Sequence, residues 1–100
     1  MAELDFFFHP DAEAEFLAAF QWYWDRNHET ANAFDDAVMA AIGLIRRNPS
    51  AWPPYLHGTQ KFVVQKFPYN IAYREKHERL EIIALAHQRR RPGYWANRLA

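Results

Sequence analysis

Four residues in the second half of the chain are of types that do acid–base chemistry on a phosphodiester: Arg74, His87, Arg89 and Tyr94. Cleavage of such a bond without a metal needs a base for the attacking hydroxyl, cations against the charge that develops on phosphorus, and an acid for the leaving oxygen. Lys61 or Lys66 would supply further cations. His87 also has a structural alternative, because a histidine at a strand end hydrogen-bonds neighbouring backbone groups, and we favour that role.

A run of three arginines, Arg89-Arg90-Arg91, follows the last apolar stretch of the chain. Each exposed arginine adds a salt-dependent attraction to phosphates that does not depend on base sequence. The same run suits an acidic segment of a partner protein, or a solvated strand end. Arg74 differs because it lies in mid-strand, where a charge is costly unless it faces water or a partner. Arg74 is therefore our strongest single functional candidate.

Other site classes are excluded by residue types and spacing. The five histidines show no paired spacing or HExxH motif, so we expect no metal site and no cofactor. With three glycines and a single serine, Ser50, the sequence has neither a phosphate-binding glycine loop nor a serine nucleophile motif. Tyr94 and Trp95 could stack on a nucleobase, but we expect Trp95 to close an edge of the core.

The segment from Lys61 to Trp95 must position these residues, and its β-branched and aromatic content predicts three strands at roughly 60–67, 69–76 and 79–87. Alternation along a strand places Arg74 and one of the lysines on one sheet face, opposite an apolar face. We expect the apolar face to cover a pair of helices and the basic face to stay open.

The first half of the chain supplies those helices. A short apolar run, Leu4 to Phe8, predicts an opening strand, and Pro10 suits the first turn of a helix. Two apolar stripes at helical spacing, separated by a polar join, predict an antiparallel helical hairpin. The element order is β-α-α-β-β-β, an α+β fold in which the hairpin packs on a small, mainly antiparallel sheet.

The first helix is apolar around nearly its whole circumference, which is more than one core contact can bury. Trp22 is the residue that we expect to remain exposed as an anchor for a partner, with self-association as the competing explanation. A partner would use the outer grooves of the hairpin or an exposed strand edge.

Charge is divided between the two halves although the total is zero. Residues 1–45 hold nine acids and one base, a net −8, and residues 46–100 hold eleven bases and three acids, a net +8. This division favours a polyanion or an acidic protein segment as partner, unless the halves neutralise each other within the fold. We expect one domain, residues 1–100, in the cytoplasm, because the chain lacks cysteine, a signal peptide and a membrane span.

Several stretches in this order resemble the ParE/RelE superfamily of type II toxin–antitoxin toxins, and in particular its ParE-like plasmid stabilisation branch. They are HPDAEAEFLAAFQWYW, IRRNP, WPP, KFPYNIAYR, IIALAHQRR and PGYW. The resemblance implies a growth-arresting toxin that is neutralised by a cognate antitoxin, usually encoded beside it, with a toxin–antitoxin hetero-oligomer as a possible assembly. RelE-like members cut mRNA on the ribosome, whereas ParE-like members are associated with DNA gyrase and are not enzymes.

The predicted site residues divide accordingly. Arg74, His87, Arg89 and Tyr94 are candidate catalytic residues only if the protein is a ribonuclease. The residues expected to bind a target or the antitoxin are Lys61, Lys66, Arg89, Arg90, Arg91 and Trp22. A non-toxic binding module is the alternative from another class, because fold alone does not settle activity.

Overall fold

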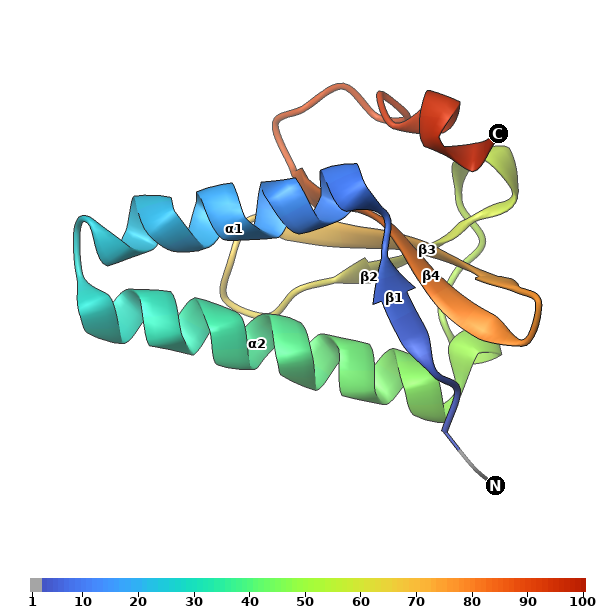
Figure 1. Cartoon of the computed structure of the whole chain (residues 1–100), viewed down its shortest axis with the longest axis horizontal. Coiled ribbons are helices and arrows are strands. Elements are labelled where there is room, and N and C mark those ends of the chain that lie inside the picture. The colour runs from blue at the N-terminus through green and yellow to red at the C-terminus, as the bar shows by residue number, and fades with distance from the viewer. Residues whose placement is uncertain (1–2) are drawn as a thin grey trace.

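The computed structural model describes residues 3–100 and shows two helices packed on a four-stranded sheet (Figure 1). The helices and strands follow the predicted order β-α-α-β-β-β: β1 (Phe6–Phe8), α1 (Pro10–Trp24), α2 (His28–Arg47), β2 (Gln60–Val63), β3 (Tyr69–Lys76) and β4 (Arg79–His87). Three short 3₁₀ turns complete the chain: Pro49–Ala51, Leu56–Gly58 and Ala96–Leu99. No helix within residues 3–100 is long and apolar enough to cross a membrane.

Local chemistry sets where the two helices begin. Pro10 occupies the first helical position of α1, where its missing N–H costs nothing. The side chain of Asn27 caps α2 by accepting a hydrogen bond of 2.9 Å from the backbone N–H of Thr30. The polar segment between the helices is therefore confined to residues 25–27, and α1 and α2 lie antiparallel, as predicted.

The sheet has the order β1-β4-β3-β2, with β1 parallel to β4 and the other pairs antiparallel. β3 and β4 have the predicted bounds. β2 ends at Val63 instead of residue 67, because the chain turns there and Lys66 adopts a left-handed φ of 68°. The predicted mainly antiparallel sheet is confirmed.

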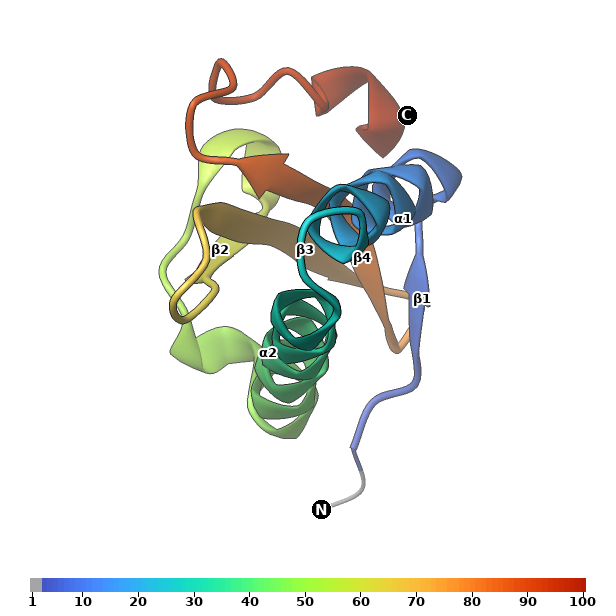
Figure 2. The same ribbon diagram turned by 90° about the vertical axis from the view of Figure 1, so that its left-hand side faces the viewer.

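One sheet face packs on both helices and carries most of the core (Figure 2). Phe34 of α2 is fully buried at its centre and contacts rings from α1 and from the end of the sheet next to Tyr69. The buried stripe of α2 continues through Val38, Ile42 and Ile45. This is the apolar face that the sequence predicts.

The second sheet face is covered by the C-terminal tail, so the prediction of an open basic face is wrong. Trp95 is only 1% exposed and packs on Ala72, Ile83 and Ala84. A bulge in the β3–β4 ladder adds one residue, Ile83, to the tail side. Figure 2 shows the tail crossing the sheet on the side away from α2. The expected burial of Trp95 is confirmed.

Candidate functional site

The Glu15 carboxylate, on α1, binds the C-terminal tail to the body of the protein. Its oxygens accept hydrogen bonds from the Tyr94 hydroxyl, from Nη1 and Nη2 of Arg98 at 2.8 and 3.1 Å, and from the Leu85 backbone N–H at 3.1 Å. The side chains of Glu15 and Arg98 are only 16% and 11% exposed. Charged groups at this depth need such partners, so the contacts fix the tail in place.

The same two side chains also close the free edge of β4. β1 accompanies β4 only as far as Ile82, whose carbonyl accepts from the N–H of His9 at 2.9 Å. Beyond that point the Ile83 carbonyl accepts from Arg98 at 3.1 Å, and the Leu85 N–H donates to Glu15. Side chains thus satisfy the backbone groups that a neighbouring strand would otherwise pair.

These contacts change the acidity of the tail residues. Burial, and then the hydrogen bond to Glu15, raise the pKa of Tyr94 far above its ordinary value, so its hydroxyl stays a donor. Burial alone would lower the pKa of Arg98, but its hydrogen bonds to Glu15 and the carboxylate charge outweigh burial and raise it. Tyr94 is therefore unsuited to act as a base here.

Arg74 is bound within the protein. Its Nε donates to the Glu81 carboxylate at 2.8 Å, and its Nη1 donates to the Leu99 carbonyl at 3.2 Å. The two paired side chains are only 20% and 10% exposed. The ion pair with Glu81 explains how Arg74 can lie in mid-strand without facing a target.

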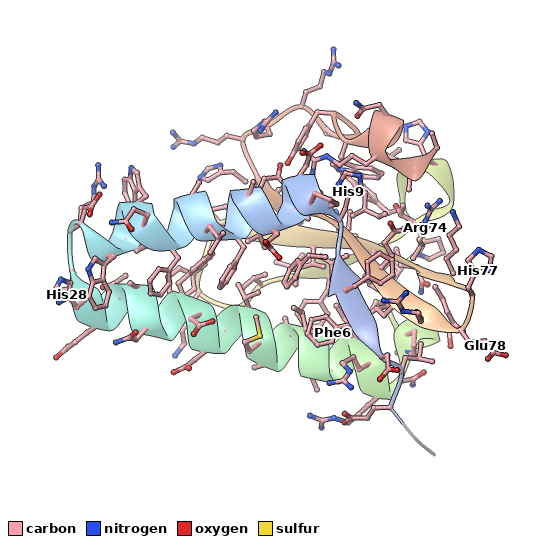
Figure 3. The ribbon with its side chains drawn as sticks, in the orientation of Figure 1. Phe6, His9, His28, Arg74, His77 and Glu78 are labelled. Carbon is pink, nitrogen blue, oxygen red and sulfur yellow. The ribbon has the colours of Figure 1, made fainter. Side chains whose placement is uncertain are left out.

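The four candidate catalytic residues do not converge. Arg74 lies near the β3–β4 turn, with His77 and Glu78 (Figure 3), whereas His87 pairs with Tyr69 at the opposite end of β3. Arg74 is five positions after Tyr69 along β3, which at about 3.3 Å per residue is roughly 16 Å. Arg74 and His87 therefore cannot contact the same phosphate.

His87, Tyr94 and Arg90 lie together, in a groove between α1, the start of β3 and the end of β4. The groove has a volume of about 510 Å³, and its walls include Ala18, Trp22, Tyr69, Leu85, His87 and Arg90. The imidazole of His87 accepts a hydrogen bond from the Arg89 N–H at Nδ1, 3.1 Å away, the contact expected for a structural role. Trp22 is 53% exposed, as expected for an anchor residue.

The predicted cationic residues are spread over two regions. Arg89, Arg90 and Arg91 are exposed just beyond β4. Lys61 shares the tail-covered face, and its Nζ lies 4.7 Å from the centre of the Tyr55 ring, whereas Lys66 is exposed in the β2–β3 turn. Of these cationic residues, Arg90 lines the groove.

Ion pairs between the two halves of the chain account for part of the charge division. Glu3 pairs with Arg46 and Arg47 at 3.7 and 3.5 Å, and Glu15 pairs with Arg98 at 2.8 Å. The alternative in which the halves neutralise each other therefore holds for these residues. The arginine run takes less part in these pairs, because Arg90 comes no closer to the Glu15 carboxylate than 4.0 Å.

Glu15 is an important residue that the sequence reasoning did not single out. A usable signal was present: Ala12 and Ala19 are both buried, and Glu15, three residues after one and four before the other, lies on the same helix face. A carboxylate on the buried stripe of a helix needs a cationic partner elsewhere in the chain.

Comparisons with known proteins agree with this geometry. No curated protein matches the sequence. A solved structure described as the chromosomal ParDE TA system from P. aeruginosa is similar, with a TM-score of 0.73, 12% identity, and coverage of 85% of this chain and 96% of that one. The family model for the ParE toxin of the type II toxin-antitoxin system parDE matches residues 6–92. The chain therefore belongs to the ParE toxin family of type II toxin–antitoxin systems.

Proposed function

We propose that this chain is the toxin of its module, that it arrests growth from the cytoplasm by acting on DNA gyrase, and that a cognate antitoxin neutralises it in a hetero-oligomer. Membership of the ParE toxin family supports the toxin role. The solved structure similar to it is described as a ParDE system, which supports an antitoxin as partner.

The ion pair between Arg74 and Glu81 favours a toxin that acts by binding its target over one that cleaves RNA. A catalytic arginine must have its guanidinium free to meet the developing charge on phosphorus. Here that group contacts Glu81 and the Leu99 carbonyl, about 16 Å along β3 from the position paired with His87. The surface proposed for contact with target or antitoxin includes Trp22 and the Arg89–Arg91 run, and Lys61 and Lys66 are proposed as contacts apart from it.

Controlled expression of the protein alone tests the proposal first. We expect growth to stop, and co-expression of the antitoxin to restore it. Normal growth with soluble, folded protein would instead support a non-toxic binding module.

Two assays with purified protein then identify the target. We expect the protein to inhibit supercoiling by gyrase and to leave mRNA intact on translating ribosomes. Cleavage of mRNA, with supercoiling unaffected, would contradict the gyrase proposal and reinstate the ribonuclease alternative with His87 and Tyr94.

A further inference from the structure

We infer that the outward face of α2 binds the same face of a second copy of this chain across a two-fold axis, with the two helices antiparallel. The inference goes beyond the proposed function, because it concerns contact between two toxin molecules. Its basis is a helix face on which opposite charges and apolar side chains are placed symmetrically about one point.

The outward face of α2 is the face opposite its buried stripe. At about 100° per residue, Asp36, Ala40 and Arg47 lie within about 40° of one another around the helix axis. Phe34 and Ile45, which are fully buried, lie on the other side of the helix. Asp36, Ala40 and Arg47 are all exposed, and Figure 1 shows α2 along the lower border of the molecule. This face is therefore accessible to a second molecule.

The charge on this face changes sign along the helix. Asp36 enters no ion pair among residues 3–100. Arg47 lies in the last turn with its side chain 64% exposed, and its Nη2 lies 3.5 Å from the position that a Cβ at Gly43 would take. The guanidinium therefore lies on the outward face. Its exposed ion pair with Glu3, at 3.5 Å, contributes little and leaves N–H donors for a second carboxylate.

Apolar side chains occupy the surface between these two charges. Met39 and Leu44 are 40% and 43% exposed and lie toward opposite edges of the outward face. Ala40 and Gly43 lie between them and are small, so a second helix can approach closely. The centre of this face can therefore exclude water when a second helix packs on it.

These residues are placed symmetrically about the middle of the segment 36–47. A two-fold axis perpendicular to α2 at that midpoint brings Asp36 of each copy level with Arg47 of the other, so that two ion pairs form. The same axis brings Met39 of each copy level with Leu44 of the other. An isologous contact requires this symmetry, whereas an unrelated partner protein does not, which favours a second copy.

The size of the face predicts a weak dimer. A stable interface buries about 800 Å² on each partner. One face of a 20-residue helix, about 30 Å long, supplies less. We therefore expect a Kd of about 10–100 μM. The residues that line the groove lie outside α2, so this contact does not occupy the groove.

Sedimentation velocity of the full chain over a concentration series tests the dimer. We expect Asp36→Arg to raise Kd at least about tenfold, because it places like charges together at both symmetric positions, and Arg47→Asp to do the same. An equimolar mixture of the two variants should recover a Kd within about threefold of wild type, because both ion pairs then join opposite charges again. Glu13→Arg makes the same charge change at an exposed position of α1 and should leave Kd near wild type.

Disulfide crosslinking supplies a second measurement, because the chain contains no cysteine. Residue 40 lies next to the proposed axis, where the Cα atoms of two copies can approach to the roughly 4.4–6.8 Å that a disulfide spans. Ala40→Cys should therefore form a covalent dimer under mild oxidation, at least about ten times faster than Glu13→Cys. Circular dichroism confirms that each variant is folded.

Three outcomes overturn the inference. A wild type that stays monomeric at the highest concentration lacks such a contact. A mixture of Asp36→Arg and Arg47→Asp that stays monomeric, beside a wild type that dimerises, places the contact on another face. Loss of the dimer in Trp22→Ala, with Asp36→Arg unchanged, assigns the contact to α1. Each of these results leaves the proposed function standing, because growth arrest and gyrase inhibition are measured separately.

Discussion

The two faces of the sheet are closed in different ways. On the helix face, Phe34 contacts four other rings at centre-to-centre distances of 5.1–5.8 Å, within one continuous core. On the tail face, Trp95 packs on Ala72, Ile83 and Ala84, and the polar contacts of Glu15 and Arg74 hold the tail around it. The packing on the helix face follows from repeated apolar patterns in the sequence, whereas the packing on the tail face depends on a few individual contacts.

The largest expected effect compares one residue from each face. Phe34→Ala removes the centre of the main core and should lower the free energy of unfolding by about 4 kcal/mol, enough to unfold a marginal domain. Trp95→Ala should cost about 3 kcal/mol, mostly as local opening of the tail, while α1 and α2 stay protected from amide hydrogen exchange. Denaturant unfolding and native-state hydrogen exchange measure the two effects. Uniform loss of protection in Trp95→Ala would show that both faces unfold as one unit.

The next expected effect tests the polar contacts of the tail face. Glu15→Gln leaves the charge of Arg98 buried without its carboxylate, and should cost about 3 kcal/mol. Glu13→Gln changes an exposed residue of the same helix and should cost less than about 0.5 kcal/mol. Thermal unfolding of both variants makes the comparison. Equal stability of the two would mean that the Glu15 contacts contribute little.

These contrasts also mark what could be predicted from the sequence. The helical hairpin, the starts of both helices and the bounds of β3 and β4 follow from apolar spacing, Pro10 and Asn27, all of which act locally. The short β2 could not be predicted, because the left-handed turn at Lys66 carries no glycine or asparagine to mark it.

The contacts of the tail face could not be predicted either, because they join residues that are far apart in the sequence. Glu15 meets Tyr94 and Arg98 across 79 and 83 positions of sequence, and no periodic pattern encodes such a pair. Arg74 was correctly singled out as a costly mid-strand charge, but its partner, Glu81, lies on the next strand at the paired position. Sequence therefore identified the unusual residue and could not distinguish an internal partner from an external one.

Alkaline pH tests the helix face through Tyr73, which faces it and donates to the Pro49 carbonyl at 2.6 Å. Burial raises the pKa of Tyr73 to about 12 from the ordinary value of 10.0. The unfolded chain therefore loses this proton first, so stability is complete below pH 10 and falls between pH 10 and about 12, by up to about 1.4 kcal/mol per pH unit.

Tyr73→Phe should reduce that alkaline slope by about one proton and leave the slope below pH 9 unchanged, as measured by urea unfolding at a series of pH values. Its cost at neutral pH should be only about 1 kcal/mol, because Gln60 still donates to the Pro49 carbonyl. An unaltered slope above pH 10 would show that Tyr73 titrates alike in both states.

The smallest expected effect is a gain in stability that both faces of the sheet share. His77 and Glu78, at the β3–β4 turn, have φ of 53° and 62°, the left-handed region that a type I′ turn requires and that these residues disfavour. The double variant His77→Asn, Glu78→Gly should raise stability by about 1 kcal/mol. Hydrogen exchange should slow equally on both faces, and a gain confined to one face would contradict a common β3–β4 ladder.

The most direct test of the claim that Arg74 is bound within the protein and does not act on the target uses the double variant Arg74→Met, Glu81→Leu. Replacing a buried ion pair by apolar residues of similar size is often neutral for stability, whereas Arg74→Met alone leaves Glu81 unpaired and should destabilise. In cells whose growth the wild type arrests, we predict that the double variant is folded and still arrests growth. A double variant with wild-type thermal stability and no growth arrest would contradict the account.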